Sequence, residues 1–143
     1  LNATVLETGT LRIEKTNNVT LLKGFDEGAW WIQDVAATLP VKLLGNVEGK
    51  HVIDLCAAPG GKTAQLINSG AKVSAVDRSA KRLYRLKKNL SRLKMNATTF
   101  CSDVNKWEPE EKADFILLDA PCSSTGTIRR HPDILHLKKE EDI

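Results

Sequence analysis

Four polar segments each follow a short apolar run, and together their side chains could hold a nucleoside. The segment CAAPGGKT occupies positions 56–63, and acids stand at Asp77, Asp103 and Asp119. In an open α/β sheet, ligands bind just outside the carboxyl ends of parallel strands. If each apolar run is a strand, the four segments meet in one crevice. That convergence is stronger evidence for a site than any one motif.

The glycine loop and the acids after it predict an adenosine ligand. Gly60 and Gly61 carry no Cβ, so the backbone there can approach a ligand closely. A helix that begins near Lys62 would point its free N–H groups into the same space. An acid about 20 residues past such a loop typically accepts hydrogen bonds from ribose hydroxyls, and Asp77 is so placed. Asp103, after the third run, could then contact the adenine amino group.

Three ligand classes compete for this loop. A dinucleotide site needs G-x-G-x-x-G, whereas positions 57–62 read A-A-P-G-G-K and lack the pyrophosphate turn. A phosphate-binding P-loop needs G-x-x-x-x-G-K-[ST]. Gly61, Lys62 and Thr63 fit its end, but Cys56 stands where the first glycine belongs. An adenosine ligand without a polyphosphate remains, and S-adenosylmethionine is such a ligand.

The segment LLDAPCSSTGTIRRHPDI at 117–134 places an acid, a proline and a cysteine at the cofactor end of the fourth run. Together with DLCAAPGGKT at 54–63 and AVDRS at 75–79, it makes the sequence resemble the RNA cytosine-5 methyltransferases. GFDEGAWWIQDVAA at 24–37 is similar to that family's lead-in to the cofactor domain. The resemblance covers nearly the whole chain from Gly9. It implies an S-adenosylmethionine-dependent enzyme, and the RRHPDI segment favours the members that modify 16S ribosomal RNA.

The resemblance also implies roles for individual residues. Asp119 would select cytosine by accepting a hydrogen bond from its N4 amino group. Cys122 would help to release the product, although the equivalent cysteine is the nucleophile in related DNA enzymes. In RNA enzymes the nucleophile lies in a later Thr-Cys motif, which is absent from these 143 residues, so we expect little or no turnover. The implied cofactor contacts are Cys56, Ala57, Ala58, Pro59, Gly60, Gly61, Lys62, Asp77, Asp103 and Asp119, and the implied RNA contacts are Arg129, Arg130 and His131.

Composition restricts the other possibilities. The net charge of +3 is too small to identify a nucleic-acid partner by itself. Between Arg78 and Lys94 there are eight basic residues and no acid, a run that usually forms a solvated helix face but can also attract phosphate. Three cysteines without CxxC spacing predict reduced thiols in a cytoplasmic protein, with no disulfide framework and no metal site. No apolar run approaches the length of a membrane span.

Periodicity predicts the elements that position these residues. Continuous apolar runs indicate buried parallel strands at 51–56, 72–76, 97–101 and 114–118, and they alternate with helices. Helices are expected at 28–44 with a kink or break at Pro40, at 62–68, and after Ser79, where the apolar stripe is Leu83, Leu86, Leu90 and Leu93.

These elements predict an α/β, Rossmann-like class I methyltransferase fold with a parallel sheet. Only the first four of the family's seven strands are expected, so the fourth strand would present an open edge and could mediate self-association. We divide the chain into a lead-in (1–45) and the N-terminal part of the cofactor domain (46–143). Leu1 stands where a complete protein would begin with Met, which suggests a piece of something longer. A non-catalytic RNA-binding module with a vestigial cofactor pocket remains the alternative function.

Overall fold

A four-stranded parallel sheet forms the centre of the computed structural model, which describes residues 3–14, 18–122, 125–128, 131–137 and 139. Its strand order is β5–β4–β3–β6. The strands are β3 (His51–Leu55), β4 (Lys72–Asp77), β5 (Thr98–Cys101) and β6 (Phe115–Leu118). The principal helices are α1 (Val35–Leu43), α2 (Gly61–Asn68) and α3 (Ala80–Arg92). The predicted α/β fold with a parallel sheet is therefore confirmed.

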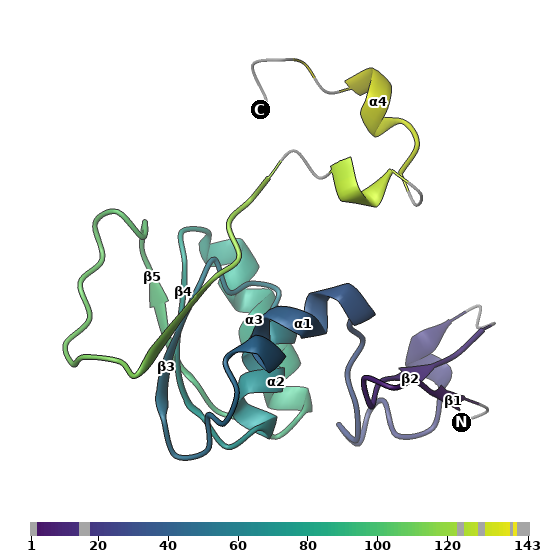
Figure 1. Cartoon of the computed structure of the whole chain (residues 1–143), viewed down its shortest axis with the longest axis horizontal. Helices are drawn as coiled ribbons and strands as arrows, with labels where there is room; N and C mark the ends of the chain where they lie inside the picture. Colours follow the sequence, from purple (N-terminus) through teal and green to yellow (C-terminus); the bar gives the residue numbers. More distant parts are fainter. Residues whose placement is uncertain (1–2, 15–17, 123–124, 129–130, 138, 140–143) are drawn as a thin grey trace.

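The register aligns the carboxyl ends of the strands. Leu55 pairs with Val76 of β4 and with Leu118 of β6, and Asp77 pairs with Cys101 of β5. The segments that follow these strands must therefore begin at the same edge of the sheet. In Figure 1, α1, α2 and α3 lie together on one side of the sheet. From β3 the chain adds β4 and then β5 on one side, and it then adds β6 on the other side of β3. The switch point in strand order therefore lies beside β3.

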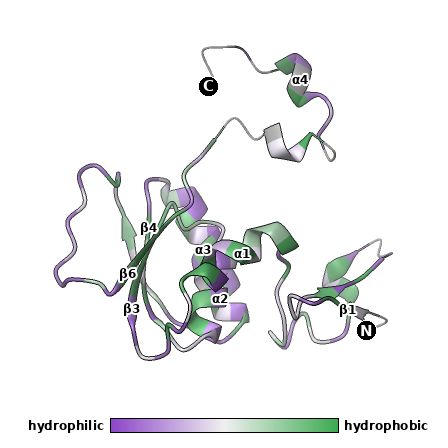
Figure 2. Cartoon of the chain, in the orientation of Figure 1, coloured by the Kyte–Doolittle hydropathy of each residue, from purple (hydrophilic) through white to green (hydrophobic). Residues whose placement is uncertain are grey.

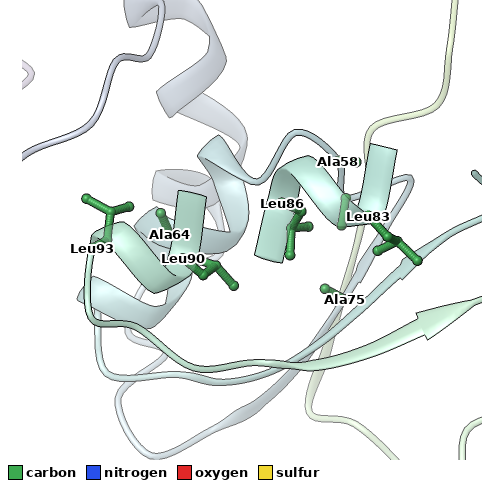
Figure 3. Packing of buried hydrophobic residues seen from close by; sticks show 8 residues of the cluster. Ala58, Ala64, Ala75, Leu83, Leu86, Leu90 and Leu93 are labelled. Carbon is green, nitrogen blue, oxygen red and sulfur yellow. The ribbon is translucent and has the colours of Figure 1, made fainter. Parts of the chain in front are cut away.

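Two hydrophobic clusters fix the helices on the sheet. The first joins the stripe of α3 to Ala64 of α2 and Ala75 of β4 (Figure 3). The second joins Leu66 of α2 to Val52 of β3 and Leu117 of β6. Because α2 contributes to both clusters, its amino terminus, and with it the glycine loop, has one position relative to the sheet.

Helix α3 begins and packs as its sequence predicts. The Ser79 hydroxyl accepts a hydrogen bond from the Arg82 N–H at 3.3 Å and caps the first turn. Leu83, Leu86 and Leu90 are buried on the side that faces the sheet. The helix ends at Arg92, and Lys94 then adopts a left-handed backbone with φ of 56°.

The lead-in departs from the prediction of one helix over residues 28–44. Helix α1 begins only at Val35, because the Asp34 carboxylate caps it by accepting from the Ala36 N–H at 3.0 Å. Pro40 does not break it, since the helix continues to Leu43. Gly28 has a φ of 74°, and a Cβ there would collide with the Arg92 carbonyl oxygen. The segment before α1 is therefore a loop shaped by its contact with α3.

The remaining elements lie outside the sheet. The short antiparallel pair β1 (Thr4–Val5) and β2 (Leu11–Arg12) lies beyond the helices (Figure 1). The other short helices are η1 (Val19–Leu21), η2 (Thr125–Thr127) and α4 (Ile134–Leu137).

Strand β6 is an edge strand, as predicted. Figure 2 shows it in the hydrophobic colour and the loop before it in the hydrophilic colour. Leu117 packs toward the helices, whereas Ile116 and Leu118 point to the other face and are 61% and 58% exposed.

In the described part of the chain, no helix is long and apolar enough to span a membrane.

Candidate cofactor site

The glycine loop is a tight turn between β3 and α2. Cys56 and Gly60 both have a left-handed backbone, with φ of 61° and 101°. The Gly60 N–H donates to the Ala57 carbonyl at 2.9 Å, which closes the turn. A Cβ at Gly60 would lie 3.0 Å from Leu86 Cγ, so both conformation and packing require glycine there. A Cβ at Gly61 would meet nothing closer than Gln33 at 3.8 Å, so packing does not explain that glycine.

Asp77 organises this loop from the end of β4. One carboxylate oxygen accepts from the Ala58 N–H at 3.2 Å and the other accepts from the Ser79 N–H at 2.9 Å. The Arg82 guanidinium lies 3.4 Å from the first oxygen, and Asp77 is only 1% exposed. The predicted contact of Asp77 with a ribose would thus use a carboxylate that already holds the loop.

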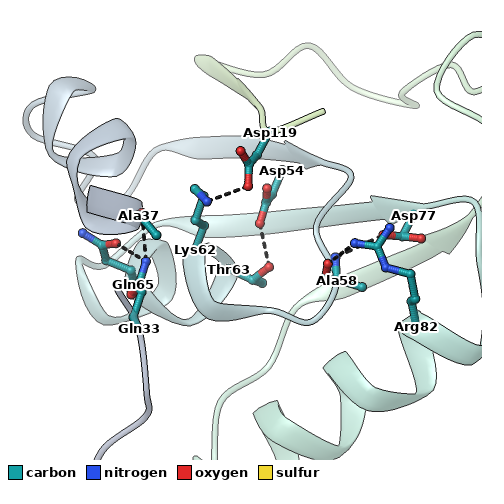
Figure 4. A network of polar contacts seen from close by, with 10 residues as sticks. All are labelled: Gln33, Ala37, Asp54, Ala58, Lys62, Thr63, Gln65, Asp77, Arg82 and Asp119. Carbon is teal, nitrogen blue, oxygen red and sulfur yellow. Dashed lines mark hydrogen bonds and ion pairs between the residues drawn. The ribbon is translucent and has the colours of Figure 1, made fainter. Parts of the chain in front are cut away.

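Two side chains of α3 that the sequence reasoning missed also hold the loop. Arg82 donates to the Ala58 carbonyl (Figure 4), and Asn89 donates to the Pro59 carbonyl at 3.0 Å. Arg82 and Asn89 are seven residues apart, so both lie on the flank of α3 that faces the loop. A polar pair at that spacing beside an apolar stripe was the available signal.

Lys62 and Asp119 join the glycine loop to the segment after β6. Their Nζ and Oδ2 atoms lie 2.6 Å apart, and the Lys62 side chain is 15% exposed (Figure 4). The Asp119 N–H also faces the Leu55 carbonyl at 3.4 Å. The two family motifs, whose cysteines Cys56 and Cys122 are 66 positions apart, are thus in direct contact at the carboxyl edge of the sheet.

Asp54 lies beneath the loop in a buried position. It accepts a hydrogen bond from the Thr63 hydroxyl at 2.6 Å. Its other carboxylate oxygen is buried without a hydrogen-bond partner in the described structure. Burial raises the pKa of Asp54 from 3.8 to about 6, although the Thr63 hydrogen bond and Lys62 act in the opposite direction.

The other predicted site residues lie around the same edge. The Ser102 N–H donates to the Asp77 carbonyl at 3.2 Å, which brings the segment after β5 beside β4. Asp103 accepts from the Asn105 N–H at 2.9 Å, and that bond lowers the pKa of its carboxyl. The four strand ends are therefore neighbours, as predicted, while the contacts of each residue with a cofactor stay predictions.

The cysteines differ in their surroundings. Cys56 is half-buried, and burial, followed by the charge of Asp77, raises the pKa of its thiol. Cys122 is exposed beyond β6. Cys101 is exposed as well. A protonated thiol at Cys56 is a poor nucleophile, which leaves Cys122 as the better candidate for chemistry.

The predicted RNA contacts can be placed only in part. Arg129 and Arg130 lie outside the described residues. His131 is exposed, and its N–H donates to the Thr127 carbonyl at 2.9 Å. Its contact with RNA stays a prediction.

Comparison with known proteins identifies the family. The family described as 16S rRNA methyltransferase RsmB/F matches residues 41–143. The chain belongs to this family. Because the family consists of S-adenosylmethionine-dependent methyltransferases, the predicted cofactor class is confirmed.

Curated relatives of this RsmB/F family member carry the name ribosomal RNA small subunit methyltransferase B. The protein from Photorhabdus laumondii is 46% identical over 138 residues, which are 93% of this chain and 32% of the relative. The protein from Erwinia tasmaniensis is 48% identical with the same coverage. The chain thus spans about a third of the length of these relatives.

Solved structures show the same fold. NSun6 from Pyrococcus horikoshii, crystallised with SFG, superposes with a TM-score of 0.77 at 32% identity, over 90% of this chain and 34% of that one. A methyltransferase homologue from Pyrococcus horikoshii gives a TM-score of 0.67 at 32% identity, over 90% of this chain and 41% of that one. The Rossmann-like assignment is therefore supported by sequence and structure together.

Proposed function

We propose that this chain provides the cofactor-binding part of an enzyme that transfers a methyl group from S-adenosylmethionine to carbon 5 of a cytosine in 16S ribosomal RNA. The observation that carries the proposal is the Lys62–Asp119 ion pair, which joins the glycine loop to the DAPC segment at 2.6 Å. It brings the candidate cofactor loop and the candidate base-recognition residue to one place. A ribosomal RNA substrate also favours a cytoplasmic protein.

The residues at this edge suit an adenosyl sulfonium ligand. Gly61 has no packing reason to be glycine, which fits close approach by a ligand. Asp77 and Asp103 supply carboxylate oxygens that can accept from hydroxyl and amino groups. The carboxylates also attract a positively charged ligand, whereas a triphosphate would be repelled. When bound, the cofactor supplies an electrophilic methyl group.

The chain's own residues would then act on the base. Asp119 would accept from the cytosine N4 amino group and so distinguish cytosine from uracil, with Lys62 holding its carboxylate in position. Cys122 would assist product release, while a cysteine beyond these 143 residues would add to carbon 6 as the nucleophile. The target base must leave its stack to reach both groups. We therefore expect this chain alone to turn over little or not at all.

A chimera tests the proposal. The corresponding third of the Photorhabdus laumondii relative is replaced by this chain, and methyl transfer to 16S ribosomal RNA is followed with labelled S-adenosylmethionine. Digestion of the RNA and mass spectrometry should find 5-methylcytosine. Methylation at another atom, or on another base, would refute the proposed reaction. Asp119→Asn in the chimera should reduce transfer to cytosine without removing cofactor binding.

A further inference from the structure

The basic run from Arg78 to Lys94 divides into two groups in the structure. Arg82 contacts Asp77 and the Ala58 carbonyl, and Arg92 donates to the carbonyls of the lead-in and lies over the Phe25 ring, 4.1 Å from its centroid. The other six side chains are exposed and form no ion pair in the part of the chain that the structure describes. They are Arg78, Lys81, Arg85, Lys87, Lys88 and Lys94.

Three of these cations lie on the same side of α3 as an exposed tyrosine. Tyr84 and Arg85 each lie three or four residues from Lys81 and from Lys88, so the four side chains share one side of the helix, opposite its buried leucines. We call this set the outer face of α3. Tyr84 is 70% exposed. Helix α3 itself contains no carboxylate that could pair with these cations.

Folding stability does not explain this arrangement. Lys81 and Arg85 are four residues apart and Arg85 and Lys88 are three apart, so like charges repel along the helix. Lys81 lies in the first turn, where positive charge opposes the helix dipole, and the first turn contains no acid. A polyanion bound outside the helix would relieve both effects.

The position of the face relates it to the cofactor site. Arg82 and Asn89, on the adjoining flank of the same helix, bind the carbonyls of Ala58 and Pro59 in the glycine loop. A strand of nucleic acid on the outer face would therefore lie beside the loop that we assign to the cofactor. Exposed rings among basic side chains are the usual platform for single-stranded nucleic acid, because bases stack on the ring and phosphates pair with the cations.

We propose that the outer face of α3 binds a single-stranded segment of the substrate RNA, with Tyr84 stacking on a base and Lys81, Arg85 and Lys88 contacting phosphates. This inference deepens the proposed function and rests on it for the identity of the RNA. It assigns the face a role in substrate affinity and none in the methyl-transfer step.

The test compares two triple variants of equal charge. K81Q/R85Q/K88Q removes the cations of the outer face, and K23Q/K72Q/K106Q removes three exposed lysines elsewhere. Binding of a fluorescent single-stranded RNA is measured by anisotropy at several salt concentrations. Each lost phosphate contact lowers the salt slope by about 0.7, so the first variant should lose about 2 and bind roughly tenfold or more weakly. The affinity of the control variant should change far less. Tyr84→Ala should weaken the binding of single-stranded RNA more than the binding of duplex RNA.

The outcomes separate this inference from the proposed function. Equal RNA affinity in the two triple variants would overturn the inference. Binding to phosphatidylserine vesicles is measured in parallel, and the inference would also fail if K81Q/R85Q/K88Q lost affinity for the vesicles but kept its affinity for RNA. Calorimetry with S-adenosylmethionine should give the same affinity for both variants and the parent. If RNA binds through the outer face while the parent binds no S-adenosylmethionine, the inference stands and the proposed function fails.

Discussion

Asp54 offers a prediction whose size follows from its surroundings. Its folded-state pKa is about 6, whereas the ordinary value is 3.8. The native protein therefore holds this proton more tightly than the unfolded chain, and stability falls as pH rises from 3.8 to 6. Above that window the ionised carboxylate costs about 3 kcal/mol. Asp54→Asn is neutral at every pH and keeps an oxygen that can accept from the Thr63 hydroxyl.

The expected result is a pH-dependent difference between variant and parent. Between about pH 4 and about pH 8, the free energy of unfolding of Asp54→Asn should gain about 2–3 kcal/mol relative to the parent. Urea unfolding followed by tryptophan fluorescence measures this, with the exposed Asp26→Asn as the matched control. If the difference in unfolding free energy between variant and parent stays constant across this pH range, the raised pKa of Asp54 is refuted. A difference that moves in the other direction would mean that Lys62, and not burial, dominates at Asp54.

Three further substitutions test the packing around the site. Leu86→Ala should cost about 2–5 kcal/mol of unfolding free energy in urea titrations, because Leu86 is fully buried under Gly60, and a cost below about 1 kcal/mol would contradict this. Gly28→Ala should release the lead-in from α3 and speed proteolysis of the lead-in. Gly9 has a similar φ of 76° but lies in open space, so Gly9→Ala should not have this effect. Equal proteolysis rates in the two variants would show that backbone conformation alone matters. Ile116→Lys should reduce self-association through the exposed β6 edge in light scattering, and a strictly monomeric parent would remove that expectation.

The elements around the sheet could be predicted because each depends on local sequence. The apolar runs located all four strands within a few residues, and Ser79 with the leucine stripe located α3. The lead-in could not be predicted in this way, since the loop before α1 depends on Gly28 meeting the Arg92 carbonyl, a contact between residues far apart in sequence.

The site shows the same division. Motif spacing predicted that the segments after β3, β4, β5 and β6 would meet, and they do. It did not predict which side chains hold them together. Asp77, Arg82 and Asn89 bind the glycine loop through long-range contacts, and Asp54 accepts a hydrogen bond from Thr63. Such partners depend on how α3 is rotated on the sheet, which the helical period alone does not determine.

Calorimetric titration of this chain with S-adenosylmethionine, S-adenosylhomocysteine and ATP with magnesium tests the crevice at the carboxyl ends of β3, β4, β5 and β6 most directly. We predict one site for each of the two adenosyl compounds, weakened by Asp77→Asn, and no binding of ATP. Magnesium-dependent ATP binding, or no binding of either adenosyl compound by folded protein, would contradict the account.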